Sequence, residues 1–187
     1  MRTEKIIMIL KRIFTAIFMV VFLTLIGWLI FEATRPEILP LGSPTPELQY
    51  FDGTKFLLLK ADSTHNTMVV LFHRECEHCQ YQLKQFNSYL NDFGDTKIFL
   101  LTTEKKFFEN NGLKQWSTLV HAKNIHWGIV NRNEFKKKFG GIIFPSIFLF
   151  NRSAKLFDKI RGEVKLQKIL KSLRNLGGPE HQISGHN

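Results

Sequence analysis

The hydrophobic pattern of the chain begins with one long apolar run and continues with short apolar runs separated by mixed segments. Residues 13–31 contain no charged side chain. Short continuous apolar runs bounded by turn residues then predict buried strands at residues 67–73, 97–102, 125–130 and 146–150. Two shorter runs on either side of Asp52-Gly53, at residues 48–51 and 56–59, predict a β-hairpin.

Apolar residues in the segments between these strands recur every three or four positions, which is typical of helices packed on a core. This pattern predicts helices at residues 77–93, 105–119, 133–139 and 163–176, the second interrupted near Gly112. The turn at 151–153 leads into a further strand at 155–160. Three strands alternating with helices, then a hairpin and a last helix, predict an α/β three-layer sandwich whose sheet has one antiparallel edge.

The run at residues 13–31 has the length of a membrane-spanning helix, which needs about 20 apolar residues. Residues 6–10 can extend it. Four Lys and Arg residues precede the run and only Arg35 follows closely, which predicts a cytoplasmic N-terminus at residues 1–12 and an extracytoplasmic (periplasmic) remainder. A cleaved secretory signal is the alternative, but residues 31–33 offer only one small side chain for a cleavage site. We therefore favour an uncleaved signal-anchor in the cell membrane.

The chain beyond this run divides into three parts by composition. Residues 32–46 contain four prolines together with Gly42 and Ser43, which predicts an extended linker. Residues 47–176 hold all the other predicted elements and form one domain. Residues 177–187 are polar and predict a disordered tail.

The formal net charge of +10 could favour nucleic acid, anionic lipid or an acidic partner. The Lys and Arg residues are scattered, however, apart from the short run at residues 136–138. That run lies in the predicted helix 133–139, where a solvated helix face explains it. We therefore expect no nucleic-acid partner.

Cys76 and Cys79 are the only cysteines of the chain, and Glu77 and His78 lie between them. They follow the predicted strand 67–73 and open the predicted helix 77–93, so they can close a small disulfide at a strand-to-helix junction. Unpaired N–H groups and the helix dipole favour a thiolate at the first cysteine. An exported domain lies where disulfides persist. The pair therefore suits reversible dithiol–disulfide exchange.

With these residues the chain resembles the thioredoxin-fold superfamily, and within it the membrane-anchored TlpA/ResA-like thiol-disulfide oxidoreductases. The resemblance covers residues 41–176. It rests on an apolar strand followed by Cys-Glu-His-Cys, Phe144-Pro145-Ser146 before an apolar strand, the turn 151–154, and Gly162 before the last helix. It implies a thioredoxin-like fold with an N-terminal β-hairpin and a central helix-strand insertion.

The resemblance also implies roles for the site residues. Cys76 would be the nucleophile and Cys79 the resolving thiol, with no cofactor beyond their redox-active disulfide. Pro145 in cis would present the backbone of Phe144 to a substrate peptide.

Three neighbours of the cysteines would tune the redox potential in opposite directions. His78 can stabilise the Cys76 thiolate, whereas Glu75 and Glu77 disfavour it. Glu75 also departs from the family, which usually has Trp, or Pro with a small residue, just before the first cysteine. We find no clear match to the buried acid that assists proton transfer in some members.

The function that the resemblance implies is exchange with thiols or disulfides of protein substrates, more in the reducing direction, with a membrane thiol transporter as electron donor. Copper delivery stays open as an alternative, because thiolates and imidazole suit Cu(I), although Sco-type copper chaperones carry CxxxC. A non-catalytic adaptor also stays open. We assign no metal site: His78 lies inside the motif and cannot easily join both sulfurs on one metal. Gln80 excludes haem attachment through CxxCH, and His73 and Val69 stand where a peroxiredoxin has Thr and Pro.

Overall fold

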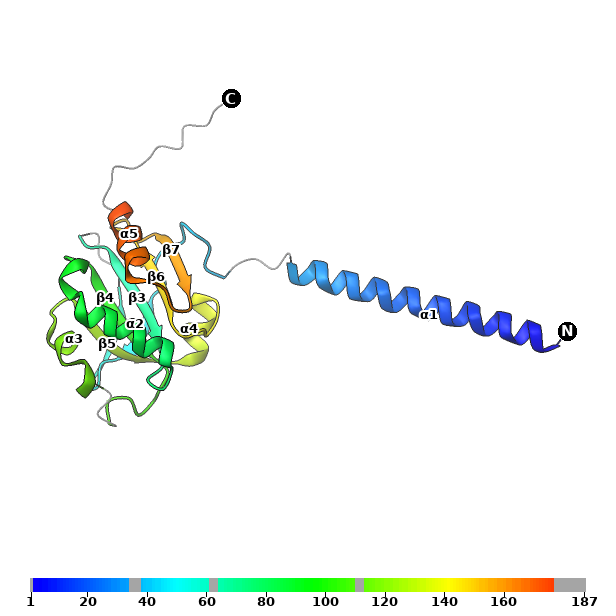
Figure 1. Ribbon diagram of the computed structural model, residues 1–187, viewed down its shortest axis with the longest axis horizontal. Coiled ribbons are helices and arrows are strands. Elements are labelled where there is room, and N and C mark those ends of the chain that lie inside the picture. Colours follow the sequence, from blue (N-terminus) through cyan, green and yellow to red (C-terminus); the bar gives the residue numbers. More distant parts are fainter. Residues whose placement is uncertain (1, 34–37, 61–63, 110–112, 177–187) are drawn as a thin grey trace, which may run out of the picture. The chain divides into compact units, whose positions relative to one another are not determined.

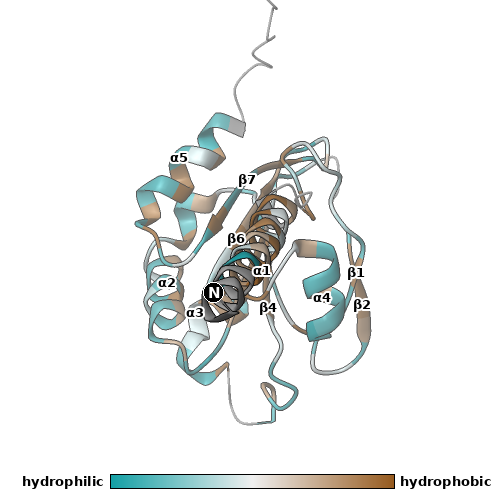
Figure 2. Cartoon of the chain, turned by 90° about the vertical axis from the view of Figure 1, so that its right-hand side faces the viewer, coloured by the Kyte–Doolittle hydropathy of each residue, from teal (hydrophilic) through white to brown (hydrophobic). Residues whose placement is uncertain are grey.

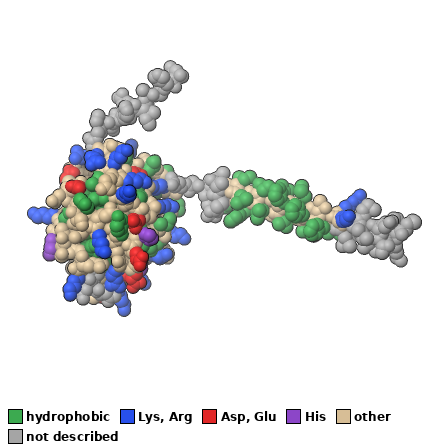
Figure 3. Space-filling model, in the orientation of Figure 1, with side chains coloured by type: hydrophobic (Ala, Val, Ile, Leu, Met, Phe, Trp, Pro, Cys, Tyr) green, Lys and Arg blue, Asp and Glu red, His purple; other side chains and the backbone are tan. Residues whose placement is uncertain are grey.

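The computed structural model describes residues 2–33, 38–60, 64–109 and 113–176. The chain divides into two compact units, Met1–Glu37 and Ile38–Asn187. The first unit contains α1 (Arg2–Ala33), drawn in blue in Figure 1. Its segment Lys11–Phe31 is long and apolar enough to cross a membrane, and its apolar side chains are exposed (Figure 3). An anchor and a signal sequence both have these properties.

The second unit is built on a seven-stranded sheet with the order β2-β1-β5-β4-β3-β6-β7. Its strands are β1 (Leu48–Phe51), β2 (Phe56–Leu59), β3 (Thr67–Phe72), β4 (Lys97–Thr102), β5 (Ile125–Val130), β6 (Ser146–Phe150) and β7 (Leu156–Arg161). The central strands β3, β4 and β5 are parallel. The sequence predicted one antiparallel edge, and the structure has two, because β1 of the opening hairpin pairs antiparallel with β5 and β6 pairs antiparallel with both β3 and β7.

Helices cover both faces of the sheet, which confirms the predicted three-layer α/β sandwich. Figure 2 shows α2, α3 and α5 on one side of the sheet and α4 on the other. The elements are α2 (Glu77–Ser88), the 3-10 turns η1 (Leu90–Phe93) and η2 (Lys114–Trp116), α3 (Ser117–His121), α4 (Arg132–Phe139) and α5 (Leu166–Leu176).

Strand β3 shows how the two cores arise from one run of apolar residues. All six of its residues are buried. Met68, Val70 and Phe72 belong to the cluster that includes residues of α2, α3 and α5. Val69 and Leu71 belong to the second cluster, with Phe135 and Phe139 of α4 among its members. A strand that buries both faces has no polar alternation, which explains its continuous apolar sequence.

The predicted helix 105–119 is wrong over its first part. In the described part of this segment, helical structure is confined to η2 and α3, at 114–121. The predicted interruption at Gly112 lies outside the described residues. Two neighbouring phenylalanines pack on different partners instead. The Phe107 ring lies 5.4 Å from that of Phe72, and the Phe108 ring lies 6.3 Å from that of Phe51. Tertiary packing thus overrides a weak helical pattern.

Part of the segment that the sequence assigns to the linker belongs to the second unit. Leu39 is buried, and the N–H groups of Gly42 and Thr45 donate to the carbonyls of Leu156 and Ala154 at 2.7 and 2.8 Å. Residues 38–46 thus lie along the β6–β7 hairpin. Residues 34–37 and the predicted tail 177–187 lie outside the described residues.

Candidate active site

The two cysteines lie where the chain passes from β3 into α2. Cys76 is the N-cap of α2, with an extended backbone (φ −84°, ψ 114°), and its carbonyl accepts from Gln80 N at 3.0 Å to begin the helix. Cys79 follows one turn later. The structure describes both cysteines as free thiols, with Cys76 half-buried and Cys79 buried.

Cys76 occupies a helix N-terminus whose backbone donors are left open. In the described structure its side chain makes no capping hydrogen bond. Such orphan N–H groups, together with the helix dipole, stabilise negative charge at this position. The Cys76 sulfur also lies 3.9 Å from the carbonyl oxygen of Phe144. The exposed thiol is therefore directly beside the Phe144–Pro145 segment.

The Phe144–Pro145 peptide bond is cis. The ring of Phe144 lies 5.4 Å from that of His73, so the segment packs on the residue that follows β3. Pro145 itself is buried, and its carbonyl accepts from Gly162 N at 2.8 Å. Residues from two distant parts of the sequence therefore meet at the Cys76 sulfur.

Cys79 has the opposite environment. Its side chain has no exposed surface, and the backbone N–H of His73 lies 3.5 Å from its sulfur. Burial raises the pKa of the Cys79 thiol to about 12, and the neighbouring Cys76 thiol adds to this rise. Because only a thiolate attacks a disulfide, Cys79 is a latent thiol in the dithiol form while Cys76 is within reach of solvent.

The His78 side chain pairs with Glu163. Its Nδ1 lies 2.8 Å from Glu163 Oε2, and the His78 side chain is 73% exposed. Glu163 precedes α5 and is 85 positions away in sequence. Sequence reasoning missed Glu163, although the neighbouring Gly162 was singled out as part of the resemblance.

Glu104 is a second residue that sequence reasoning missed. It follows β4 and has a side chain only 15% exposed. Its Oε1 accepts from Arg74 N at 2.6 Å and lies 3.6 Å from His73 Nδ1. Gln80 reinforces the same loop by donating to the Arg74 carbonyl at 2.8 Å. Glu104 lies just after the carboxyl end of the parallel strand β4, where site residues collect in α/β sheets. This position is the sequence signal that could have identified it.

Glu75 and Glu77 are both exposed, on either side of Cys76. Glu75 N lies 3.3 Å from His73 Nδ1, and Glu77 is in the first turn of α2. Their carboxylates face water, where charge effects are screened over about 10 Å at 0.1 M salt. Their tuning role stays a prediction.

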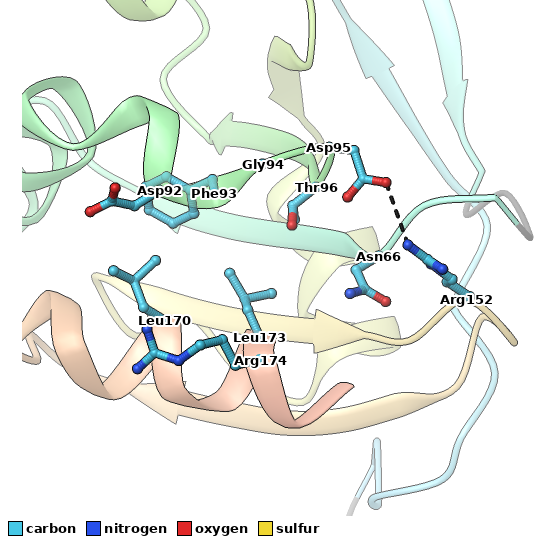
Figure 4. Close-up of a pocket in the computed structure, with 10 residues that line it drawn as sticks. All are labelled: Asn66, Asp92, Phe93, Gly94, Asp95, Thr96, Arg152, Leu170, Leu173 and Arg174. Carbon is cyan, nitrogen blue, oxygen red and sulfur yellow. Dashed lines mark ion pairs between the residues drawn. The ribbon is translucent and has the colours of Figure 1, made fainter. Parts of the chain in front are cut away.

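A separate pocket of about 450 Å³ lies at the other end of the strands. Figure 4 shows Asn66 and Thr96, which precede β3 and β4, facing Leu170 and Leu173 of α5, with Asp95 and Arg152 paired at 3.5 Å. Its lining contains neither a cysteine nor a histidine. The two cysteines lie beyond the carboxyl end of β3, at the other end of the strands from this pocket.

Two further observations bear on partners. Among the described residues, no group of three or more His, Cys, Asp or Glu side chains is placed to hold a metal ion. On the face shown in Figure 3, Lys and Arg side chains of the second unit are spread among other residues.

No protein-family model matches the sequence, and no curated protein matches it either. Solved structures do resemble the fold. A thiol:disulfide interchange protein from Bacteroides sp. has a TM-score of 0.55 and 15% identity, covering 80% of this chain and 98% of that one. StoA from Bacillus subtilis has a TM-score of 0.53 and 14% identity, covering 70% and 98%. A peroxiredoxin-like protein from Aquifex aeolicus has a TM-score of 0.62 and 13% identity, covering 76% and 90%. The fold is therefore thioredoxin-like, with two cysteines close together at the start of α2.

Proposed function

We propose that this protein is a thiol–disulfide oxidoreductase that exchanges disulfides with protein substrates through Cys76 and Cys79. One observation carries the proposal. A half-buried thiol at an uncapped helix N-terminus stands in the same first turn as a fully buried thiol whose pKa is raised to about 12. A structural disulfide needs no such difference between its two cysteines, whereas stepwise exchange does.

In the first step the Cys76 thiolate attacks one sulfur of a substrate disulfide. A Cys76–substrate disulfide forms, the substrate S–S bond breaks, and the other substrate sulfur leaves as a thiolate that takes up a proton. The orphan N–H groups of α2 stabilise the attacking charge. The reaction therefore begins at the exposed sulfur.

In the second step Cys79 loses its proton and attacks the Cys76 sulfur. The Cys76–Cys79 disulfide forms and the second substrate thiolate leaves, so the substrate gains two electrons and two protons in total. Burial disfavours the Cys79 thiolate, so this step requires that the Cys79 proton be removed as the sulfur attacks.

The backbone beside Cys76 supplies a place for the substrate chain. The Phe144 carbonyl lies 3.9 Å from the Cys76 sulfur, close enough for a substrate peptide next to its own cysteine to pair with this segment. Phe144 and Pro145 thus form the proposed substrate-binding segment.

The proposed direction is reduction of substrates, with electrons supplied by a membrane thiol donor. This direction rests on the resemblance to TlpA/ResA-like proteins and on the apolar helix α1, which we propose as a signal-anchor that places the second unit outside the cytoplasm. The in-cell redox state of the cysteines tests it, by acid quenching and a mass-shifting thiol reagent. A mostly reduced pair supports the reductase, and a mostly oxidised pair overturns that direction.

The exchange function itself is tested by trapping. Cys79→Ala leaves the first step intact and removes the second, so mixed disulfides with substrate proteins should accumulate and disappear on addition of dithiothreitol. Cys76→Ser is the matched control and should trap nothing. If no adducts form, and the protein binds Cu(I) stoichiometrically only when both cysteines are present, copper delivery would replace disulfide exchange as the proposed function.

A further inference from the structure

A tight turn at residues 73–76 joins β3 to α2 and brings one backbone donor to the buried sulfur. Cys76 N donates to the carbonyl of His73 at 3.2 Å, which closes the turn. At the start of the turn, His73 N donates to the Cys79 sulfur at 3.5 Å. Burial raises the pKa of the Cys79 thiol, and the bond from His73 opposes this rise, because a donor stabilises the thiolate. The position of the turn therefore decides whether the buried sulfur keeps this donor as it becomes negative.

Glu104 fastens this turn to the neighbouring strand. Its Oε1 accepts from Arg74 N at 2.6 Å, and the same oxygen lies 3.6 Å from His73 Nδ1. Its Oε2 lies 3.6 Å from Arg74 Nε. One carboxyl group thus contacts the first two residues of the turn.

The fold holds Glu104 itself in place. Thr102 ends β4, is fully buried, and pairs with Phe72 at the end of β3. Glu104 N donates to Thr102 Oγ1 at 3.3 Å, and the Glu104 side chain is only 15% exposed. Gln80 holds the turn from α2 by donating to the Arg74 carbonyl at 2.8 Å. Arg74 is therefore bonded through its N–H to one element and through its carbonyl to another.

We propose that Glu104 is a positioning residue for the second step of exchange, and that it holds the His73 N–H on the Cys79 sulfur. It acts through the turn, by bonding to Arg74 N. This inference rests on the proposed exchange function and deepens it. In the second step the Cys76–Cys79 bond forms and the bond between Cys76 and the substrate breaks. The proton that Cys79 gives up to water balances the one that the leaving substrate thiolate takes from water.

Loss of this acceptor should slow the second step and spare the first. Without Glu104 the turn loses its bond to β4, so the His73 donor is no longer held on the sulfur that becomes negative. The first step depends instead on the N–H groups of α2 beside Cys76. A hydrogen bond to a charged atom is stronger than one between neutral groups. We therefore expect Glu104→Ala to slow the second step about tenfold, which converts to about 1.4 kcal/mol in the barrier.

Both steps can be followed in one reaction of the full chain with an aromatic disulfide, dithiobis(nitrobenzoate). One protein dithiol and one molecule of this reagent give the protein disulfide and two coloured aromatic thiolates, with release of two protons. Two electrons pass from the protein to the reagent. The first thiolate appears at a rate proportional to reagent concentration, and the second at a rate independent of it. Glu104→Ala should change only the second rate.

Two conservative variants separate positioning from charge. Glu104→Gln keeps the side-chain length and an oxygen that accepts from Arg74 N, so the second rate should stay within about twofold of the original. Glu104→Asp keeps the charge but is one methylene too short, so it should lose most of the rate that Glu104→Ala loses. The reverse order, with Asp active and Gln slow, would overturn the proposal. Equal slowing of both steps in Glu104→Ala would also overturn it.

Gln80→Ala tests the same turn from its other side, and it serves if Glu104→Ala does not fold. It removes the bond to the Arg74 carbonyl and should slow the second step about threefold. Amide hydrogen exchange checks the cause, because the His73 N–H should exchange faster wherever the second step is slow. An unchanged second step in both Gln80→Ala and Glu104→Asp would overturn the proposal.

Glu134→Ala is the matched control. It removes a carboxyl group with an equally short contact, Glu134–Lys138 at 2.7 Å on α4, and should leave both rates unchanged. The two proposals can also fail separately. A normal second step in Glu104→Asp with normal trapping by Cys79→Ala removes only this inference. A slowed second step without trapped substrates removes only the proposed function.

Discussion

Helices α2 and α4 each follow a strand of the parallel core, β3 and β5, yet their N-termini are built differently. At α4 the Asn131 side chain accepts from the N–H groups of Asn133 and Glu134, at 2.9 and 3.1 Å. At α2 the same position is occupied by Cys76, which within the described structure caps nothing. The Asn131 side chain thus satisfies two N–H groups at the start of α4, whereas no side-chain cap satisfies those at the start of α2.

The difference indicates that the N-terminus of α4 serves stability, whereas that of α2 can stabilise a thiolate. A side-chain cap of the Asn type contributes about 1 kcal/mol to stability. α2 forgoes that contribution, and its open N–H groups are instead available to a negative charge on Cys76. Stability and reactivity therefore compete for the first position of the helix.

The largest effect is expected when α2 is given the cap of α4. Cys76→Asn should abolish disulfide exchange, because the attacking sulfur is gone. It should also raise the free energy of unfolding of the reduced protein by about 0.5 to 1 kcal/mol, because Asn caps the helix. Turnover with a disulfide substrate and urea unfolding measure the two results. A variant that loses both exchange and stability would show that Cys76 contributes to folding in a way that the comparison with α4 omits.

The buried thiol of α2 should make the domain sensitive to alkaline pH. Burial raises the pKa of Cys79 to about 12, against about 8.5 for an unfolded thiol. The unfolded state loses its proton first, so the stability that Cys79 contributes is fully present below about pH 8.5 and is lost as pH rises toward 12. We expect a loss of about 1 to 2 kcal/mol between pH 7 and 10.

Two variants isolate this effect from other groups that titrate at high pH. Cys76→Ser retains Cys79 as the only thiol, and Cys76→Ser/Cys79→Ala has none. The difference in their unfolding free energies should change with pH by most of this amount, because burial, the main cause of the raised pKa, remains when Cys76 is replaced. A constant difference across this range would show that Cys79 reaches solvent in the folded domain.

Removing the cap of α4 is expected to lower stability and leave disulfide exchange intact, which is the opposite of the result expected for Cys76→Asn. Asn131→Ala leaves the N–H groups of Asn133 and Glu134 without their acceptor, which should lower the free energy of unfolding by about 1 kcal/mol. Exchange at Cys76 should be unchanged, because α4 packs on the other face of the sheet. Thermal unfolding and turnover test both. Altered turnover would mean that the two helix starts are coupled through the sheet.

The contrast between the two helix starts was only partly available from the sequence. Periodicity predicted a helix at residues 133–139, and the structure places α4 at Arg132–Phe139 with Asn131 as its cap. The apolar run at residues 67–73 and the helical periodicity after it predicted the strand-to-helix junction at which Cys76 and Cys79 lie. Both are local patterns. Local patterns are what a single sequence reveals.

The missed residues act through tertiary contacts. Glu104 reaches Arg74 across 30 positions and Glu163 reaches His78 across 85. Neither carboxylate has a local pattern that points to its partner, because the contact exists only once β3, β4 and α5 have been assembled. The same reason explains why the second antiparallel edge was missed: the pairing of β1 with β5 joins strands that no turn connects.

The smallest expected effect concerns the acids in the first turns of the two helices. Glu77 in α2 and Glu134 in α4 both lie near a positive helix end, where a carboxylate contributes about 0.3 to 0.5 kcal/mol. Glu77→Gln should lower the free energy of unfolding by about that amount, and Glu134→Gln by slightly more, because it also breaks the pair of Glu134 with Lys138 at 2.7 Å. Only Glu77→Gln should also speed alkylation of Cys76 by iodoacetamide, by about twofold, because only there does a thiolate compete with the carboxylate for the same N–H groups. Equal alkylation rates in the original protein, Glu77→Gln and Glu134→Gln would mean that solvent screens the Glu77 carboxylate completely. The N–H groups at the start of α2 would then act on Cys76 without interference from Glu77.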